Sequence, residues 1–273
     1  MMLFQYSFTL SALALCLLLT GTLSFFGYHV VRRGVIFVDL ALAQVAALGA
    51  SIGILLGLGE EHPVANFAIS LGFTFLGALL FSWFRTRRKA PIEALIGITY
   101  AGAMALSLII LEKSATGTEE LKEMLVGSIL TVPPHQLALC AVVFAVIGLL
   151  VGLAHRPLFL ITENPQAAQA RGLRLWVWDL YFYSLFGIVV TLSVKAAGVL
   201  LVFAFLIVPS LASLIGTDGT WKRIGFGWAF GTVGCVLGLE ASLRLDWSAG
   251  PTIVATFILL LILVGAVAVV RKK

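Results

Sequence analysis

Residues 30–53 read VVRRGVIFVDLALAQVAALGASIG and place an acid and an amide inside an otherwise apolar stretch rich in small residues. These two polar residues are Asp39 and Gln44. The stretch has the length of a membrane span, because a transmembrane helix needs about 20 mostly apolar residues. A carboxylate inside such a helix costs at least about 2.5 kcal/mol, so it normally faces a bundle interior or a water-filled path. The pattern predicts a membrane protein that moves a polar substrate.

The composition of the whole chain also indicates an integral membrane protein. Hydrophobic residues make up 60% of its 273 residues and charged residues 11%, and the mean hydropathy is +1.08. Soluble domains have far fewer apolar and more charged residues. We therefore expect an all-α protein, a polytopic membrane helix bundle that forms a single transmembrane domain over residues 1–273.

Nine stretches of the chain have the length and composition of a span. The sixth and seventh are joined by very few residues, so a bundle of eight or nine spans is expected. The stretches run roughly over residues 4–31, 35–56, 64–84, 92–111, 136–154, 176–194, 196–215, 224–243 and 251–270.

The distribution of charged residues predicts the orientation of the spans. Basic residues accumulate in the cytoplasmic loops of membrane proteins, and with nine spans 14 of the 18 basic residues fall on one side. These are Arg32, Arg33, Arg85, Arg87, Arg88, Lys89, Arg156, Arg171, Arg174, Lys222, Arg223, Arg271, Lys272 and Lys273. We therefore expect the N-terminus outside and the C-terminus in the cytoplasm. The net charge of +5 then reflects loop bias, and no nucleic-acid binding is expected.

Prolines mark two unusual segments. Residues 121–137 contain Pro133 and Pro134 and are too short to cross the bilayer. We interpret this segment as a re-entrant or interfacial element on the outer side, with a surface helix as the alternative. In residues 194–216, Pro209 lies inside an apolar helix, where a proline frees a carbonyl and usually kinks the helix.

A third segment, residues 160–179, predicts a short cytoplasmic helix. Pro165 is suited to the first turn of a helix, and Gly172 is suited to the position just after its end. A helix that begins at Pro165 and ends before Gly172 has about seven residues. Such a helix between two spans either transmits motion or is a simple connector.

Five motifs, in this order, resemble those of the permease subunit of bacterial metal-cation ABC importers, the family that serves zinc, manganese and iron uptake. They are VDLALAQVAALG at 38–49, GSIL at 127–130, TENPQAAQARGL at 162–173, VKAAGVLLVFAFLIVPSLAS at 194–213 and GLEASLRLDWSAGPTIV at 238–254. The resemblance covers nearly the whole chain. It implies a type II ABC importer permease-like fold in the bacterial inner (plasma) membrane.

The resemblance also implies partners. They are a second permease copy, identical or similar to this chain, cytoplasmic ATP-binding cassette subunits and an extracytoplasmic solute-binding protein. The chain has no GxxxxGK[ST] phosphate loop, so ATP is expected to be bound and hydrolysed in a partner subunit and this chain is not expected to be an enzyme. No cofactor is expected to be bound by the chain, and its cargo would be a divalent metal ion.

By the same resemblance, residues 163–172 would form the coupling helix that docks in a cleft of the ATPase. These residues are Glu163, Asn164, Pro165, Gln166, Ala167, Ala168, Gln169, Ala170, Arg171 and Gly172.

Asp39 and Gln44 would be the metal pathway, but they depart from the family's pattern. In many relatives the second span carries an acid and a histidine four residues apart, which places both on one helical face. Here the two polar residues are five apart, and Gln44 stands at the histidine position. Five residues separate two side chains by about 140° on an ideal helix, unless a π-bulge absorbs one residue. The amide oxygen also makes the site more oxygen-rich than a zinc-preferring one.

Other polar residues are open to more than one interpretation. Glu60, Glu61 and His62 form either an acidic outer mouth or a solvated turn. Glu93 and Asp179 lie near the starts of spans and are interpreted as structural, since acids stabilise helix N-termini.

Two alternative functions remain. One is a permease for a metal chelate. The other is an ion-coupled secondary carrier, against which the scarcity of acids in the middle of spans counts, because such a carrier needs acids there for its coupling ion.

Overall fold

The computed structural model describes residues 7–58, 62–87, 91–112, 127 and 129–271. Nearly all of the described residues lie in helices, and none of them lies in a strand, so the expected all-α fold is confirmed. Nine of the described helices are long and apolar enough to cross a membrane. These nine are α1 (Ser7–Arg33), α2 (Val38–Leu55), α3 (Pro63–Arg87), α4 (Ile92–Leu111), α6 (Pro134–Leu153), α9 (Leu175–Ala197), α10 (Val199–Gly216), α11 (Thr220–Leu245) and α12 (Ala249–Arg271).

The helices are grouped into two compact units. The first unit comprises Met1–Val31, Glu123–Gly148 and Ser193–Lys273, and the second comprises Arg32–Lys122 and Leu149–Leu192. Three of the four boundaries between them fall within α1, α6 and α9, and the fourth lies outside the described residues.

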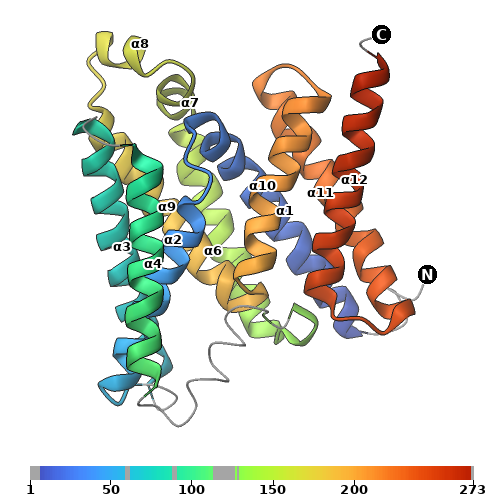
Figure 1. The fold of residues 1–273 in the computed structure, drawn as a ribbon, viewed down its shortest axis with the longest axis horizontal. Coiled ribbons are helices and arrows are strands. Elements are labelled where there is room, and N and C mark those ends of the chain that lie inside the picture. Colours follow the sequence, from blue (N-terminus) through green and yellow to red (C-terminus); the bar gives the residue numbers. More distant parts are fainter. Residues whose placement is uncertain (1–6, 59–61, 88–90, 113–126, 128, 272–273) are drawn as a thin grey trace. The chain divides into compact units, whose positions relative to one another are not determined.

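In the second unit, α2 packs against both α3 and α4, and the three helices run side by side in Figure 1. The approach of α2 to α3 is close at Gly49, where an added Cβ would lie 2.9 Å from both Phe73 Cβ and Ser70 Cα. Ser70 Oγ donates a hydrogen bond to the carbonyl of Ala46 at 2.8 Å. Small side chains let two membrane helices approach closely, and the resulting packing contacts stabilise the pair within the lipid.

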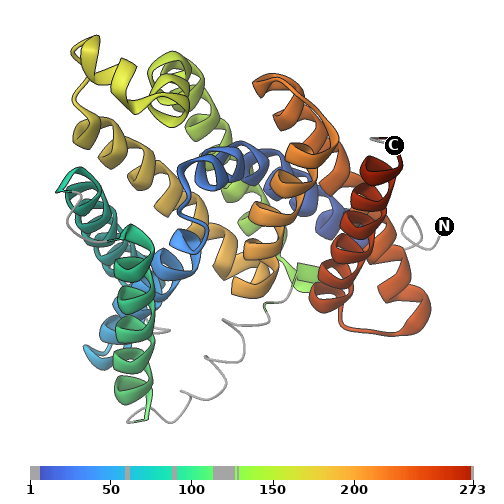
Figure 2. The same cartoon turned by 45° about the horizontal axis from the view of Figure 1, so that its top comes forward.

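In the first unit, α10, α11 and α12 pack against one another, as Figure 2 also shows. Glycines on α11 provide the room for these contacts. An added Cβ at Gly234 would lie 2.4 Å from the Phe257 ring, and one at Gly238 would lie 2.8 Å from Ile253 Cα. Gly234 and Gly238, which lie four residues apart on the same face of α11, therefore allow close packing against α12.

Pro209 lies inside a helix, as the sequence predicts. α10 runs from Val199 to Gly216 as one helix with Pro209 inside it. Nearby, Ser210 Oγ donates to the carbonyl of Leu206 at 2.7 Å. The break between α9 and α10 lies at Gly198, whose φ is 81°, close to residues 194–196 where the two predicted spans meet.

Two short helices, α7 (His155–Glu163) and α8 (Pro165–Ala170), connect α6 to α9 and are labelled in Figure 1. The sequence predicts α8 but not α7. Of the proposed outer element over residues 121–137, the structure describes Gly127 and the 3-10 turn η2 (Ile129–Thr131) before α6. Residues 121–126 and 128 lie outside the described part of the chain.

Candidate functional site

Asp39 and Gln44 are both buried in α2, each with 2% of its surface exposed. Asp39 lies in the first turn of the helix, directly after Val38. All residues of α2 are described, and they form a regular α-helix without the π-bulge that would bring Asp39 and Gln44 onto one face. The two side chains therefore leave the helix in directions about 140° apart.

Asp39 has an unusual environment for a carboxyl group. Its Oδ1 atom is buried and has no hydrogen-bond partner among the described residues. A buried carboxylate without a partner is costly, so it normally takes a proton or a cation. The described residues contain no group of three or more histidine, cysteine, aspartate or glutamate side chains that could enclose a metal ion. What this helix offers is a single acid with a free acceptor atom.

The backbone before Asp39 is held by Glu93, at the start of α4. Glu93 Oε1 accepts a hydrogen bond from the backbone N–H of Ile36 at 2.8 Å. Farther along, the N–H of Val38 donates to the carbonyl of Val35 at 3.2 Å. The sequence suggests that Glu93 has a structural role at the N-terminus of its own helix. In the structure its hydrogen bond holds the connection between α1 and α2.

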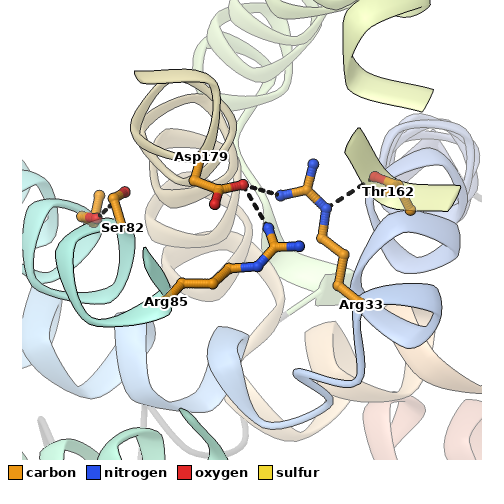
Figure 3. A network of polar contacts seen from close by, with 6 residues as sticks. Arg33, Ser82, Arg85, Thr162 and Asp179 are labelled. Atoms are coloured by element: carbon orange, nitrogen blue, oxygen red, sulfur yellow. Dashed lines mark hydrogen bonds and ion pairs between the residues drawn. The ribbon is translucent and has the colours of Figure 1, made fainter. Parts of the chain in front are cut away.

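Asp179 belongs to a buried ionic cluster in the second unit, shown in Figure 3. Its Oδ1 pairs with Arg33 Nη1 at 2.9 Å and also with Arg85 Nη1. Arg33 Nε donates to Thr162 Oγ1 at 2.9 Å. The sequence interpretation of Asp179 as an acid near a helix start is incomplete, because its main contacts are these two arginines. The count of basic residues treats Arg33 and Arg85 only as charges in loops. Their ion pairs with Asp179 join segments that are distant in the sequence, so no spacing of residues reveals them.

The predicted short helix at residues 160–179 is confirmed as α8. Asn164 caps its start, since its side chain accepts the N–H of Ala167 at 2.9 Å. Pro165 is the first helical residue, as the sequence predicts. The chain turns at Gly172, whose φ is 78°, and its N–H donates to the carbonyl of Gln169 at 2.9 Å.

Half of the residues of α8 are exposed. Gln166, Gln169 and Ala170 are exposed, and only Ala168 is fully buried. The segment that flanks the helix is exposed as well at Glu163, Asn164, Arg171 and Gly172. A capped helix with this much free surface is suited to contact another protein.

The proposed outer mouth is only partly described. Glu60 and Glu61 lie outside the described residues, while His62 is exposed and its carbonyl accepts the N–H of Asn66 at 3.1 Å.

Apolar spanning helices with a buried acid define a multi-pass membrane protein. The model of the ABC 3 transport family matches residues 5–268, and the chain belongs to this family. It is 24% identical over 253 residues to the manganese import system permease protein ScaB of Streptococcus parasanguinis, covering 92% of this chain and 88% of that protein.

Two solved structures share the fold. One is PsaBC from Streptococcus pneumoniae in complex with Fab, with a TM-score of 0.81, 22% identity and coverage of 96% of this chain and 92% of that one. The other is an inward-facing conformation of a putative metal-chelate type ABC transporter, with a TM-score of 0.71, 18% identity and coverage of 96% and 86%.

Proposed function

We propose that this chain is the permease subunit of an ATP-driven importer that moves divalent metal ions, with manganese as the first metal to test. Membership of the ABC 3 transport family and the manganese import permease among the relatives support this function. Zinc and iron are the other metals to compare, because all three are borderline or hard cations that oxygen ligands accept.

The observation that carries the proposal is the buried carboxyl of Asp39 in a span. Its Oδ1 lacks a partner among the described residues, so a passing cation would gain a ligand there without displacing an existing interaction. A single carboxylate would bind a cation weakly, and the amide of Gln44, about 140° away around α2, would be a separate contact along the path. A weak site suits a conduit, because a tightly held ion would not leave.

ATP would be hydrolysed by separate cytoplasmic ATP-binding cassette subunits. Residues 163–172, centred on α8, would be the segment that docks on them, since this segment is capped, short and largely exposed. A second permease copy and an extracytoplasmic solute-binding protein would complete the complex. The N-terminus would lie outside and the C-terminus in the cytoplasm, which follows from the bias of basic residues.

Uptake into proteoliposomes that contain the full complex tests this function. The assay compares Mn²⁺, Zn²⁺ and Fe²⁺ in the wild type and in the variants Asp39→Ala and Gln44→Ala, with ATP inside the vesicles. We expect ATP-dependent uptake of at least one metal and a loss of uptake in Asp39→Ala. Normal transport in both variants would rule out this pathway, and uptake of none of the metals would rule out the function.

A metal chelate is the second candidate cargo. The observation that favours it is Gln44, which provides a neutral oxygen at the position where the family resemblance implies an imidazole. The same vesicles supplied with a chelated metal distinguish the two, because a chelate permease would import the complex and leave the free ion outside.

A further inference from the structure

The buried ionic cluster of Arg33, Arg85 and Asp179 lies within the second unit and joins the ends of three helices, as Figure 3 shows. The side chains of Arg33 and Asp179 are 0% and 2% exposed, and that of Arg85 is 17% exposed. Arg33 also places its guanidinium 4.1 Å from the centre of the Phe182 ring. The cluster is therefore part of the packed interior and differs from a surface ion pair, which contributes little.

Arg33 contacts the chain on both sides of α8. Its Nε donates to Thr162, two residues before the capping Asn164. Its Nη1 donates to Asp179, in the helix that follows Gly172. A single planar guanidinium thus joins the segment that enters α8 to the segment that leaves it. A shift of α8 along the chain direction would strain at least one of these two hydrogen bonds.

Arg33 also lies close in sequence to the proposed metal pathway. It is the last residue of α1, and Asp39 follows six residues later. The intervening chain has little slack, since the Ile36 N–H is bound to Glu93 and the Val38 N–H to the carbonyl of Val35. A displacement of Arg33 would therefore reach the first turn of α2.

We propose that Arg33 and Asp179 are positioning residues for coupling, which link the docking segment around α8 to the start of α2. Docking and ATP hydrolysis in a partner would move α8, the cluster would carry that movement to Arg33, and the first turn of α2 would change the surroundings of Asp39. The inference rests on the function proposed above for α8 and Asp39. Buried charges suit this role, because a buried ion pair that loses one partner leaves an uncompensated charge and does not relax gradually.

The number of Mn²⁺ ions imported per ATP hydrolysed tests this link in the reconstituted full complex. Asp179→Asn keeps the shape of the side chain and removes the charge that both arginines share. We expect the imported Mn²⁺ per ATP to fall about fivefold or more, the usual size of a coupling between two sites. A merely structural role would instead lower the amount of complex, and uptake and hydrolysis would fall together at an unchanged ratio.

Thr162→Val is the milder variant. It replaces the hydroxyl that accepts from Arg33 with a methyl group of the same shape and leaves the ion pairs intact. We expect the ratio to fall about twofold or more, as the loss of one hydrogen bond predicts. If the complex with Asp179→Asn does not assemble, the ratio measured for Thr162→Val decides.

Two control variants should keep the wild-type ratio. Ser82→Ala removes a hydroxyl from α3 near Arg85 whose 2.6 Å hydrogen bond stays within its own helix. Asp218→Asn breaks an exposed ion pair with Arg223 in the first unit. A wild-type ratio in both Asp179→Asn and Thr162→Val would overturn the inference and leave the proposed function standing. Absence of ATP-dependent Mn²⁺ uptake by the wild type would overturn the function as well.

Discussion

At the scale of single residues, Asp39 contrasts with buried polar groups that have hydrogen-bond partners, and the function proposed above accounts for it. Hydrogen bonds to buried polar atoms contribute to stability, whereas a buried oxygen without a partner is a cost. The Oδ1 of Asp39 is such an oxygen among the described residues. Ser70 shows the opposite case, since its hydroxyl donates a hydrogen bond from α3 to the carbonyl of Ala46 in α2.

The variant Asp39→Asn distinguishes a role of this residue in stability from a role in metal transport. It removes the charge at nearly constant shape, so we expect the thermal unfolding midpoint of the detergent-solubilised protein to stay equal or rise. Metal uptake should fall about tenfold or more, as when a group at a metal site is lost. Asp246→Asn is the control, because Asp246 is exposed beyond the end of α11 and asparagine tolerates its φ of 54°. A lower midpoint with normal uptake would make Asp39 a structural residue.

At the scale of helices, the contact between α2 and α3 depends on the absence of a side chain at Gly49. A methyl group there would meet Phe73 Cβ and Ser70 Cα at 2.9 Å. Since a backbone atom is one of these neighbours, the helices would have to move apart.

We expect Gly49→Ala to lower the free energy of unfolding by about 1–3 kcal/mol, as overpacking does. Gly72→Ala in α3 is the matched control, because nothing lies within 4 Å of the added Cβ. That change should raise stability by about 0.5–1 kcal/mol, since alanine loses less entropy than glycine in a helix. Thermal unfolding of both variants measures the difference, and equal midpoints would contradict the packing argument.

The short helix α8 depends on its cap rather than on its length. An isolated helix of six residues is not stable in water, and Asn164 supplies the acceptor for the N–H of Ala167. Thr162 and Asp179 fix the chain on either side of it.

Loss of the cap should open α8 locally. We expect Asn164→Ala to cost about 1 kcal/mol and to speed hydrogen exchange at the amide of Ala167 about fivefold. Asn164→Ser should restore slow exchange, because serine caps helices about as well as asparagine. Fast exchange in both variants would mean that the side-chain hydrogen bond is not what holds the helix.

At the scale of the whole molecule, the sequence predicts what depends on length and local chemistry. Hydropathy over about 20 residues predicts eight or nine spans, and nine of the described helices fit. Pro165 and Gly172 predict α8. Each of these signals is contained in one short segment. The contacts of Asp179 with Arg33 and Arg85 depend on how distant segments meet, and no local pattern encodes that. The same is true of Asp39, whose missing partner is visible only once α2 is packed. The break between α9 and α10 is also a local signal, since the predicted spans meet at residues 194–196, next to Gly198, and Pro209 falls inside the second of them.

The predicted orientation has a direct test at the two ends of α11. Asp218 lies before this helix and Ser248 after it, and both are exposed. Because α11 is long enough to span the membrane, cysteines placed at these positions should lie on opposite sides. The native cysteines Cys16, Cys140 and Cys235 are buried and should not react.

With the C-terminus in the cytoplasm, a membrane-impermeant maleimide added to intact spheroplasts should label Ser248→Cys within minutes. Asp218→Cys should react only after the membrane is opened, because the positive-inside rule places its loop, with Lys222 and Arg223, in the cytoplasm. The reverse labelling pattern would mean that the chain has the opposite orientation in the membrane. It would then place α8 and the buried cluster beside it outside the cell, where no ATPase could reach them, so this one measurement also tests the coupling segment.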